Sequence, residues 1–298
     1  MSPDGSDRLT LTAFGQTGAR SKWRTEAMRS HASARLIFVA RGQGRITIAG
    51  LTSGYGPNNL VFVPAGTMYG FEVGPAVFGQ IVTIPRAMMA GWPEESRHLR
   101  LRDVAAQKVL ATHFDHLERE LQSPLPGAGR AAHHHLGLLS VFFERQLAAQ
   151  AQDSPDRRPQ SAAARLVAAY TDLIERDFHD HKGVADYAAG LGVTPTHLTR
   201  CCRRTCGRSA LDLLNDRILY EARVLLRDSD RPIREIAREL GFGSAAYFTR
   251  AFQGRTGQTP SAFRKARDIA SGDGQIAPGA QAFTALGPAV RPGPTGAL

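Results

Sequence analysis

A helix-turn-helix pattern occurs twice in the C-terminal third of this 298-residue chain and limits it to a fold with a helical C-terminal domain. In the second copy, apolar residues recur at i, i+3, i+4 and i+7, which forms one buried face of a short helix: Ile233, Ile236, Ala237 and Leu240. Gly241 ends that helix, because glycine readily adopts a positive φ. Ser244 is placed to cap a second helix, which buries Phe248, Ala251 and Phe252.

The first copy begins about 50 residues earlier, which indicates an internal duplication rather than one chance match. Its predicted buried face is Val184, Ala185, Ala188 and Leu191. Gly192 breaks this helix, Thr194 caps the next one, and Pro195 stands at the first helical position, where its missing N–H does no harm. The apolar side of that next helix is Leu198, Cys201 and Cys202. In DNA-binding proteins, the second helix of such a motif enters the major groove. We call this second helix of each copy the reading helix.

One longer helix is predicted between the two copies, over residues 209–226. Its apolar stripe, Leu211, Leu214, Ile218, Ala222 and Leu225, is wide enough to pack against both copies and to hold them at a fixed separation. A further helix over residues 162–178 leads into this region. The whole C-terminal part is therefore predicted to be helical.

The charge distribution points to a polyanionic partner. The net charge is +10, and residues 182–267 hold 16 Lys and Arg against 8 Asp and Glu, a net +8. A basic surface concentrated on a helical domain favours DNA binding. Arginine-rich helices can also be merely well solvated, and it is the duplicated motif that favours the DNA interpretation.

The C-terminal segment resembles the DNA-binding domain of the AraC family of bacterial transcription regulators. The resemblance spans residues 184–267 and includes the closing run Gly257-Gln258-Thr259-Pro260-Ser261-Ala262-Phe263-Arg264. It implies a sequence-specific, double-stranded DNA-binding transcription regulator, with RNA polymerase as a further partner. The DNA-contacting positions that it implies are Thr196, Thr199, Arg200 and Arg203 in the first copy, and Ala245, Ala246, Tyr247, Thr249 and Arg250 in the second. Arg200 and Arg250 occupy equivalent places, and an arginine there can bind guanine or clamp a phosphate.

The N-terminal part has a different pattern. Short β-rich runs, with Gly and Pro turns between them, argue for a β-sandwich or small barrel: residues 9–14, 36–39, 45–48, 60–63, 69–73 and 78–84. Residues 54–59 are expected to be one of these turns. The run 56–69 resembles the cupin-like domain found at the N-terminus of many AraC-family proteins. The predicted fold class is therefore α+β, a cupin-like β-barrel with two following helices and an all-α double helix-turn-helix domain.

The same resemblance allows a test for metal catalysis. A catalytic cupin needs several imidazole and carboxylate ligands for iron or manganese. Here Tyr69 stands where a histidine is expected, and the other candidate site offers His31 with Ser33 in place of a second histidine. One imidazole does not hold a metal. We therefore expect no enzyme, no cofactor and no metal, and instead a ligand-binding or structural domain.

The candidate effector-binding residues are aromatic, cationic or imidazole side chains of the N-terminal part. They are Trp23, Arg24, His31, Phe38, Tyr69 and Phe71, and Tyr55, Phe62 and Arg35 could also line the barrel. The run 62–72 looks most like regulators of aromatic-acid catabolism, which suggests an aromatic acid as effector. Most of these aromatics would equally serve as core in any small β-barrel.

Two helices are predicted after the β-rich part, over residues 101–121 and 137–149, with a Gly/Pro turn at 124–127. The first has an apolar stripe of Leu110, Phe114, Leu117 and Leu121, and the second has Leu138, Val141, Phe142, Arg145 and Leu147. Either both helices simply cover the barrel, or the first stripe pairs with its copy across the two-fold axis of a homodimer. Consecutive residues on a helix diverge, so His133, His134 and His135 are expected to form an exposed helix start rather than a metal site.

The three cysteines, Cys201, Cys202 and Cys206, cannot all pair with each other. A buried free cysteine behaves as a small apolar residue, and redox sensing by Cys202 and Cys206 is the alternative. The chain begins with a polar, charged stretch and has no apolar run of about 20 residues, so we expect a cytoplasmic protein with no membrane contact.

The predicted domains are residues 1–150 for effector binding and dimerisation, 151–160 as a linker, 161–267 for DNA binding, and 268–298 as a disordered tail. Three functions stay open at this point. The chain is a transcription activator responding to a small molecule, a cupin-type metal enzyme fused to a DNA-binding domain, or a DNA-binding protein whose barrel only dimerises.

Overall fold

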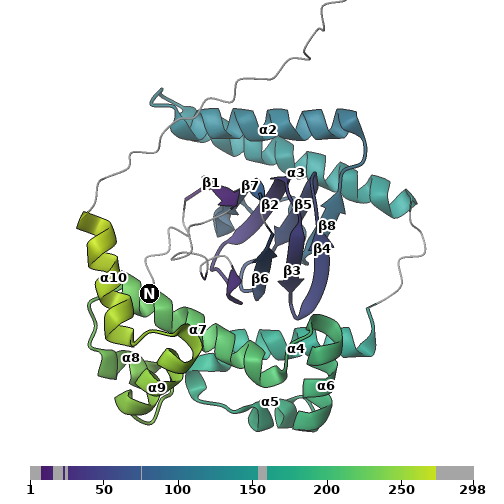
Figure 1. Cartoon of the computed structure of the whole chain (residues 1–298). Helices are drawn as coiled ribbons and strands as arrows, with labels where there is room; N and C mark the ends of the chain where they lie inside the picture. The colour runs from purple at the N-terminus through teal and green to yellow at the C-terminus, as the bar shows by residue number, and fades with distance from the viewer. Residues whose placement is uncertain (1–7, 16–22, 24–25, 75, 154–159, 273–298) are drawn as a thin grey trace, which may run out of the picture.

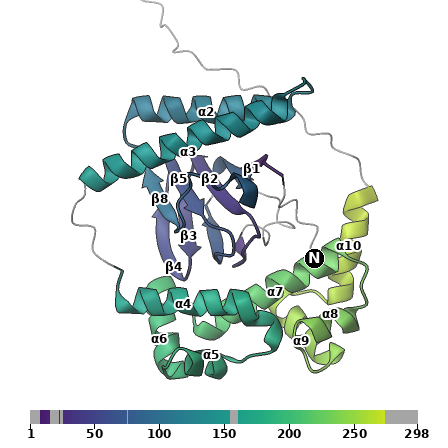
Figure 2. The same cartoon turned by 180° about the vertical axis from the view of Figure 1, so that it is seen from behind.

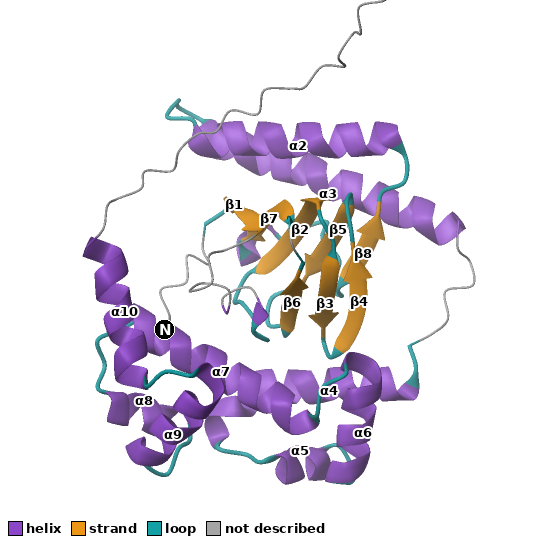
Figure 3. Ribbon diagram, in the orientation of Figure 1, coloured by secondary structure: helices purple, strands orange, loops and turns teal. Residues whose placement is uncertain are grey.

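The computed structural model describes residues 8–15, 23, 26–74, 76–153 and 160–272. Within them, two sheets lie between a pair of long helices on one side and a helical C-terminal domain on the other (Figures 1 and 3). The strands of these two sheets are β1 (Thr10–Gly15), β2 (Ala34–Arg41), β3 (Gly44–Ile48), β4 (Leu51–Tyr55), β5 (Asn59–Val63), β6 (Tyr69–Val73), β7 (Phe78–Ile84) and β8 (Arg97–Arg100).

The strands form a sandwich of two sheets rather than one closed barrel. One sheet has the order β1-β7-β2-β5-β8 and the other β4-β3-β6, and the strand pairs in both are antiparallel. Side chains alternate between the two faces of a strand. On β2, Ile37 and Val39 therefore face the second sheet, whereas Leu36 and Phe38 face the two long helices. The predicted α+β class is confirmed, and β4 and β8 are strands that the sequence patterns did not reveal.

The predicted turn over residues 54–59 is wrong in its first part, because Gly54 and Tyr55 end strand β4. Tyr55 is 4% exposed and lies between the two sheets. A glycine beside an aromatic residue is a turn signal only when neither is needed for packing. Gly54 pairs with Arg45 across the sheet, and the Tyr55 ring fills the interior.

Helices α2 (Val104–Gln122) and α3 (Ala128–Asp153) cover the outer face of the five-stranded sheet (Figures 1 and 2). The stripe Leu110, Phe114 and Leu117 is at most 1% exposed and packs inside this chain. It therefore covers the sheet, and the hypothesis that this stripe pairs across a dimer axis is wrong. Helix α3 begins at Ala128 rather than at residue 137. Its buried side includes Leu136, Leu139 and Phe143, so the predicted stripe is wrong at Leu138 and Val141, which are 55% and 40% exposed.

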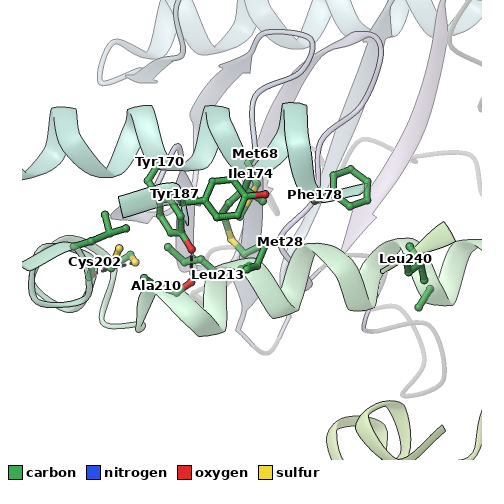
Figure 4. Close-up of a cluster of buried hydrophobic side chains, with 14 of the residues drawn as sticks. Met28, Met68, Tyr170, Ile174, Phe178, Tyr187, Cys202, Ala210, Leu213 and Leu240 are labelled. Atoms are coloured by element: carbon green, nitrogen blue, oxygen red, sulfur yellow. Dashed lines mark hydrogen bonds between the residues drawn. The ribbon is translucent and has the colours of Figure 1, made fainter. Parts of the chain in front are cut away.

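The C-terminal domain contains α4 (Ala162–Asp177), α5 (Val184–Gly190), α6 (Pro195–Cys206), α7 (Ala210–Asp228), α8 (Ile233–Glu239), α9 (Ala245–Thr256) and α10 (Pro260–Gly272). The two predicted helix-turn-helix units are α5–α6 and α8–α9, and α7 joins them. Short 3-10 turns occur at Arg86–Met88 and Phe178–Asp180. Side chains from both units share one core with α4 and α7, which explains how a fixed separation is maintained (Figure 4). Within that core, the Tyr170 hydroxyl donates to the Ala210 carbonyl oxygen at 2.8 Å.

Two of the predicted buried faces in this domain need correction. On α5, Ala185 is exposed and Tyr187 is buried in its place. On α7, Leu211 is 53% exposed, and the buried positions include Leu213 and Leu226. Both errors have the same cause. An apolar residue at the edge of a helical stripe fits the period whether its side chain points into the core or into solvent.

A buried arginine links α4 to α7, and the apolar pattern did not predict it. Arg217 is 6% exposed, and its Nε and Nη2 donate to the Glu175 carboxylate at 2.8 and 3.0 Å. Its Nη1 donates to Glu221 at 2.9 Å, and its guanidinium carbon lies 3.9 Å from the centroid of the Phe178 ring. The hydrogen bonds from two carboxylates outweigh the cost of burial and hold the pKa of Arg217 above its usual value. A buried charge is tolerated when it is paired in this way.

The sandwich also contributes side chains to the core of the C-terminal domain. Met28 and Met68 are at most 1% exposed and belong to the cluster that contains Ile174 and Leu213 (Figure 4). At the β3–β4 turn, a Cβ added to Gly50 would lie 2.2 Å from Cγ1 of Val167 on α4. The two domains are therefore in direct van der Waals contact.

The predicted domain boundaries stay predictions, but the structure describes parts of them. Helix α3 extends to Asp153 and α4 begins at Ala162, while residues 154–159 of the predicted linker lie outside the described residues. Of the predicted tail, residues 268–272 continue α10 and residues 273–298 lie outside the described part. None of the helices in the described part of the chain is both long and apolar enough to span a bilayer.

Candidate nucleic-acid interface and effector site

The two reading helices, α6 and α9, are built by the same local interactions. The Thr194 hydroxyl accepts a hydrogen bond from the His197 backbone N–H at 3.2 Å, and the Ser244 hydroxyl accepts one from the Tyr247 N–H at 3.1 Å. These bonds satisfy N–H groups that the first helical turn leaves without a partner. Gly192 and Gly241 have φ angles of 68° and 86° in the turns that precede the caps. The predicted duplication is therefore confirmed in the backbone.

Most of the predicted DNA-contacting side chains are accessible. The exposed ones are Thr196, Arg200, Arg203, Ala246, Tyr247 and Arg250, and the half-buried ones are Thr199, Ala245 and Thr249. The Thr249 hydroxyl donates to the Ala245 carbonyl oxygen at 2.8 Å, so its donor is engaged within its own helix. The exposed arginines of the two units thus occur at matching places on helices whose opposite sides, Leu198 and Phe248, are buried. Helix α9 lies on the side of the C-terminal domain that faces away from the sheets (Figures 1 and 2).

The structure brings together only three of the effector candidates of the N-terminal domain, His31, Tyr69 and Phe71. Tyr69 and Phe71 do lie between the sheets, at 1% and 2% exposure, with ring centroids 5.9 Å apart. The ring of His31 is 5.8 Å from that of Tyr69. The guanidinium of Arg29, which the sequence patterns did not single out, lies 4.7 Å from the centroid of the Tyr69 ring. Only the fold brings Arg29 to this place, because the backbone of residue 29 pairs with that of residue 69.

Two of the candidates face other partners. Phe38 lies outside the sandwich interior, with its ring 5.2 Å from that of Phe114 on α2. Trp23 packs on the C-terminal domain, 5.7 Å from Tyr220 and 5.9 Å from Phe263. The prediction that these two line the interior is wrong, because register on β2 and the course of the chain before β2 decide their placement. Arg24 lies outside the described residues.

One hollow opens at the end of the sandwich where β1, β2 and β7 meet. It is lined by Ala13, Phe14, Gly15, Arg41, Gly42, Ala76, Val77 and Phe78. Arg41 supplies its positive charge, and the guanidinium lies 5.6 Å from the Phe78 ring centroid. Phe14, one of its lining residues, connects it to the interior of the sandwich, since its ring centroid lies 4.7 Å from that of Phe71. Phe14 and Arg41 were not among the predicted effector residues, because nothing in the sequence places these two strand ends together.

Within the described residues, no group of three or more His, Cys, Asp or Glu is arranged to hold a metal ion. Tyr69, which stands at the expected ligand position, has a guanidinium over its ring instead. His133 and His134 are exposed on α3, as predicted, but the prediction is wrong for His135, which is half-buried with its ring 5.1 Å from that of His116 on α2. Consecutive helical residues point in different directions, so the three imidazoles do not converge.

The three cysteines are free and buried. Burial, with smaller contributions from the neighbouring cysteines, raises the pKa of the Cys202 thiol to about 12. Burial also raises the pKa of Cys206. A thiol whose pKa is raised is a poor nucleophile at neutral pH, so the geometry favours the interpretation of these residues as small apolar core over redox sensing.

Comparison with known proteins agrees with this arrangement. The family model described as AraC-like ligand binding domain matches residues 14–139, and the one described as helix-turn-helix domain matches residues 187–266. The chain is 25% identical to the arabinose operon regulatory protein of Salmonella typhimurium over 241 residues, 77% of this chain and 82% of that protein. It is 42% identical to the HTH-type transcriptional regulator GlxA of Rhizobium meliloti over 74 residues, 25% of this chain and 23% of that protein.

Among solved structures, ToxT from Vibrio cholerae O395 aligns with a TM-score of 0.42 and 11% identity, over 88% of this chain and 98% of that one. The sequence relatives are regulators rather than enzymes, which leaves the metal-enzyme hypothesis without support. The two family matches fall on the two domains in the expected order, one on the sandwich with its helices and one on the duplicated motif. The chain belongs to the AraC family of transcription regulators.

Proposed function

We propose that this AraC-family regulator binds DNA through both reading helices and activates transcription in response to a small anionic effector. The observation that carries the proposal is the pair Arg200 and Arg250, both exposed at equivalent places on helices that share one core. A guanidinium at such a place can donate two hydrogen bonds to guanine O6 and N7. Two reading helices on one rigid body should reach successive major-groove segments about one helical turn apart.

Selection of binding sites from random DNA, carried out with Arg200→Ala and Arg250→Ala, tests this function. Each variant should lose roughly 1–3 kcal/mol of binding free energy and relax the preference at one position. The two relaxed positions should lie about 10 base pairs apart. If both arginines clamp phosphates instead, affinity should fall equally on all sequences and the salt slope should shrink by about one unit for each arginine. Unchanged base preference in both variants would refute base reading.

For the effector, we propose the hollow beneath Arg41 as the binding site. It combines one guanidinium with apolar and aromatic walls, and Phe14 connects it to Phe71, one of the predicted effector residues. A carboxylate on a flat apolar body matches this chemistry, because the guanidinium binds the carboxylate and the body covers the half-buried ring of Phe78 beside it. An aromatic acid, which the sequence suggested, is such a molecule. In this proposal His31 and Tyr69 do not contact the ligand directly. They are linked to the hollow through the ring contacts of Tyr69 with Phe71 and of Phe71 with Phe14.

A thermal-denaturation panel of aromatic carboxylates, fatty acids and sugars tests the effector proposal. A ligand bound only by the native state at 100 times its Kd should add about 2.7 kcal/mol of stability. Arg41→Ala should abolish the shift. Arg45→Ala is the matched control, since Arg45 lies on β3 in the other sheet, pairs with Glu72 at 3.9 Å and does not line the hollow. A shift produced by sugars alone, or one that survives Arg41→Ala, would contradict the proposed site.

A second candidate is a DNA-binding protein whose sandwich only supports dimerisation. The filled interior favours it, since the aromatic rings that the described residues place between the sheets, Phe14, Tyr55, Tyr69 and Phe71, are at most 4% exposed. No thermal shift with any member of the panel would select this candidate over the first.

We propose a homodimer and RNA polymerase as further partners, acting in the cytoplasm. Exposed apolar side chains on the outer helices could contact a second copy of this chain: Val104 and Val109 on α2, and Leu138 and Val141 on α3. Three free thiols suit a reducing compartment. Two copies would present four reading helices, two for each half-site of a two-fold symmetric operator.

A further inference from the structure

We infer that His197 is a positioning residue that sets the orientation of Arg200 for base reading, with Cys201 fixing the tautomer of the imidazole. This inference rests on the proposed function, because it names what controls one of the two proposed base-reading side chains. All three residues lie on reading helix α6, in its first two turns. Only Arg200 among them carries the proposed contact with DNA.

The geometry consists of two consecutive contacts. A terminal nitrogen of Arg200, Nη2, lies 3.0 Å from Nδ1 of His197. The other imidazole nitrogen, Nε2, lies 3.6 Å from Sγ of Cys201. His197 is half-buried and Arg200 is exposed, whereas Cys201 is 4% exposed and anchored in the core of the domain. The chain of contacts therefore runs from the fixed core out to the side chain that faces the DNA.

The chemistry of the three groups assigns their roles. A guanidinium has only N–H donors, so Nδ1 of His197 must be the acceptor in the contact with Arg200. A neutral imidazole has one donor and one acceptor, so Nε2 carries the proton and donates toward the Cys201 sulfur. The acceptor of an imidazole is lost when it is protonated or when the ring is removed. Only the neutral tautomer with its proton on Nε2 can hold Arg200.

This contact uses one of the five N–H groups of Arg200. The remaining N–H groups still allow a two-pronged contact with the edge of guanine. Holding a long side chain in one orientation removes part of the conformational entropy that it would otherwise lose on binding. His197 therefore raises affinity for the correct base without itself touching DNA.

The second helix-turn-helix unit lacks the residues that make these contacts in the first. Tyr247 stands where His197 does, and Ala251 stands where Cys201 does. The Tyr247 ring packs 5.9 Å from Phe242, and for the described part of the chain no hydrogen bond between Tyr247 and Arg250 is found. A phenol in this place offers no imidazole acceptor, and an alanine offers no sulfur. The two arginines are thus equivalent in position, but a neighbouring side chain holds only Arg200 in place. Arg200 should therefore be the more selective of the two.

A double-mutant cycle in the full-length protein tests the inference. Affinity for a selected operator and for the same operator with the Arg200 base pair changed is measured for His197→Ala, Arg200→Ala and the double variant. His197→Ala should weaken binding to the selected operator by about two- to tenfold, because the Arg200 side chain must then be ordered on binding, and should weaken binding to the changed operator much less. In the Arg200→Ala background, the same substitution should have no further effect.

His197→Asn is the matched conservative variant, because the asparagine Oδ1 can take the place of Nδ1 as acceptor. It should restore most of the lost discrimination. Alanine keeps the backbone N–H that bonds to Thr194, so the helix cap survives in each variant. Melting temperatures measured in parallel should confirm that the variants fold.

The outcomes separate this inference from the function on which it rests. If Arg200→Ala leaves the base preference unchanged, base reading fails. If Arg200→Ala relaxes the preference but His197→Ala does not, only the positioning role fails. An equal loss with His197→Ala on both operators, or in both backgrounds, would also overturn the role, because it would mean that His197 acts through the fold or contacts the DNA itself.

Discussion

The hydroxyls of Thr194 and Ser244 show how single residues set the start of each reading helix. Each accepts a hydrogen bond from the backbone N–H three positions later, at 3.2 and 3.1 Å. Thr194→Ala should lower the free energy of unfolding by about 1 kcal/mol, because one N–H of the first turn loses its partner. DNA affinity should fall while base preference stays the same.

Chemical denaturation together with binding-site selection on this variant measures both effects. Ser244→Ala is the parallel variant in the second unit and should behave alike. A changed base preference in the Thr194 variant would show that the hydroxyl reads DNA directly, and the capping account would then be wrong for this position.

At the scale of secondary-structure elements, the contact between α2 and α3 contains three imidazoles. The ring of His113 lies 5.7 Å from that of Phe142, and burial, followed by the nearby His116 and His135, lowers the pKa of His113 below the usual value of a histidine. The unfolded chain therefore binds a proton more readily than the folded one. Stability should be complete above about pH 6.5 and should decrease as the pH falls toward the lowered folded-state pKa.

Urea midpoints between pH 7.5 and 5 measure this loss. His113→Phe should reduce the loss, since a phenyl ring packs against Phe142 without a proton to bind. His134→Gln is the control, because His134 is exposed on α3 and its removal should leave the pH dependence unchanged. Identical curves for the wild type and the His113 variant would exclude His113 as the source of acid sensitivity.

At the scale of the whole molecule, the β3–β4 turn is in close contact with helix α4. Gly50 has a φ of +70°, and a Cβ there would lie 2.2 Å from Cγ1 of the buried Val167. Gly66 has a φ of +73° and nothing within 4 Å of an added Cβ. Gly66→Ala should therefore cost only the backbone strain of about 1 kcal/mol, whereas Gly50→Ala should cost a further 1–3 kcal/mol, roughly, from overpacking and should separate the domains locally.

Melting temperature and amide hydrogen exchange in α4 distinguish the two variants. Faster exchange is expected in α4 with Gly50→Ala only, and Val167→Ala in the same chain should reverse it by making room for the methyl group. Equal destabilisation by the two alanines would mean that the turn does not bear on α4, and the contact between the domains would lose its main steric support.

The local features of the fold could be predicted from the sequence because short-range physics controls them. The glycine breaks at Gly192 and Gly241 and the caps at Thr194 and Ser244 depend only on residues within a few positions. The same holds for the exposure of Arg200 and Arg250, which follows from the period of the helix. These interactions are complete within one turn of the chain, so the pattern alone was sufficient.

The tertiary structure alone decided which surface each buried side chain meets. A period shows that one face is buried but not what covers it, so Phe38 and Trp23 were assigned to the sandwich interior and lie against Phe114 and Tyr220 instead. Arg217 lies outside the predicted apolar stripe of its helix and is nonetheless buried, because Glu175, 42 residues earlier in the chain, reaches it from α4. Burial of a charge depends on such distant partners, and only the folded chain brings them together.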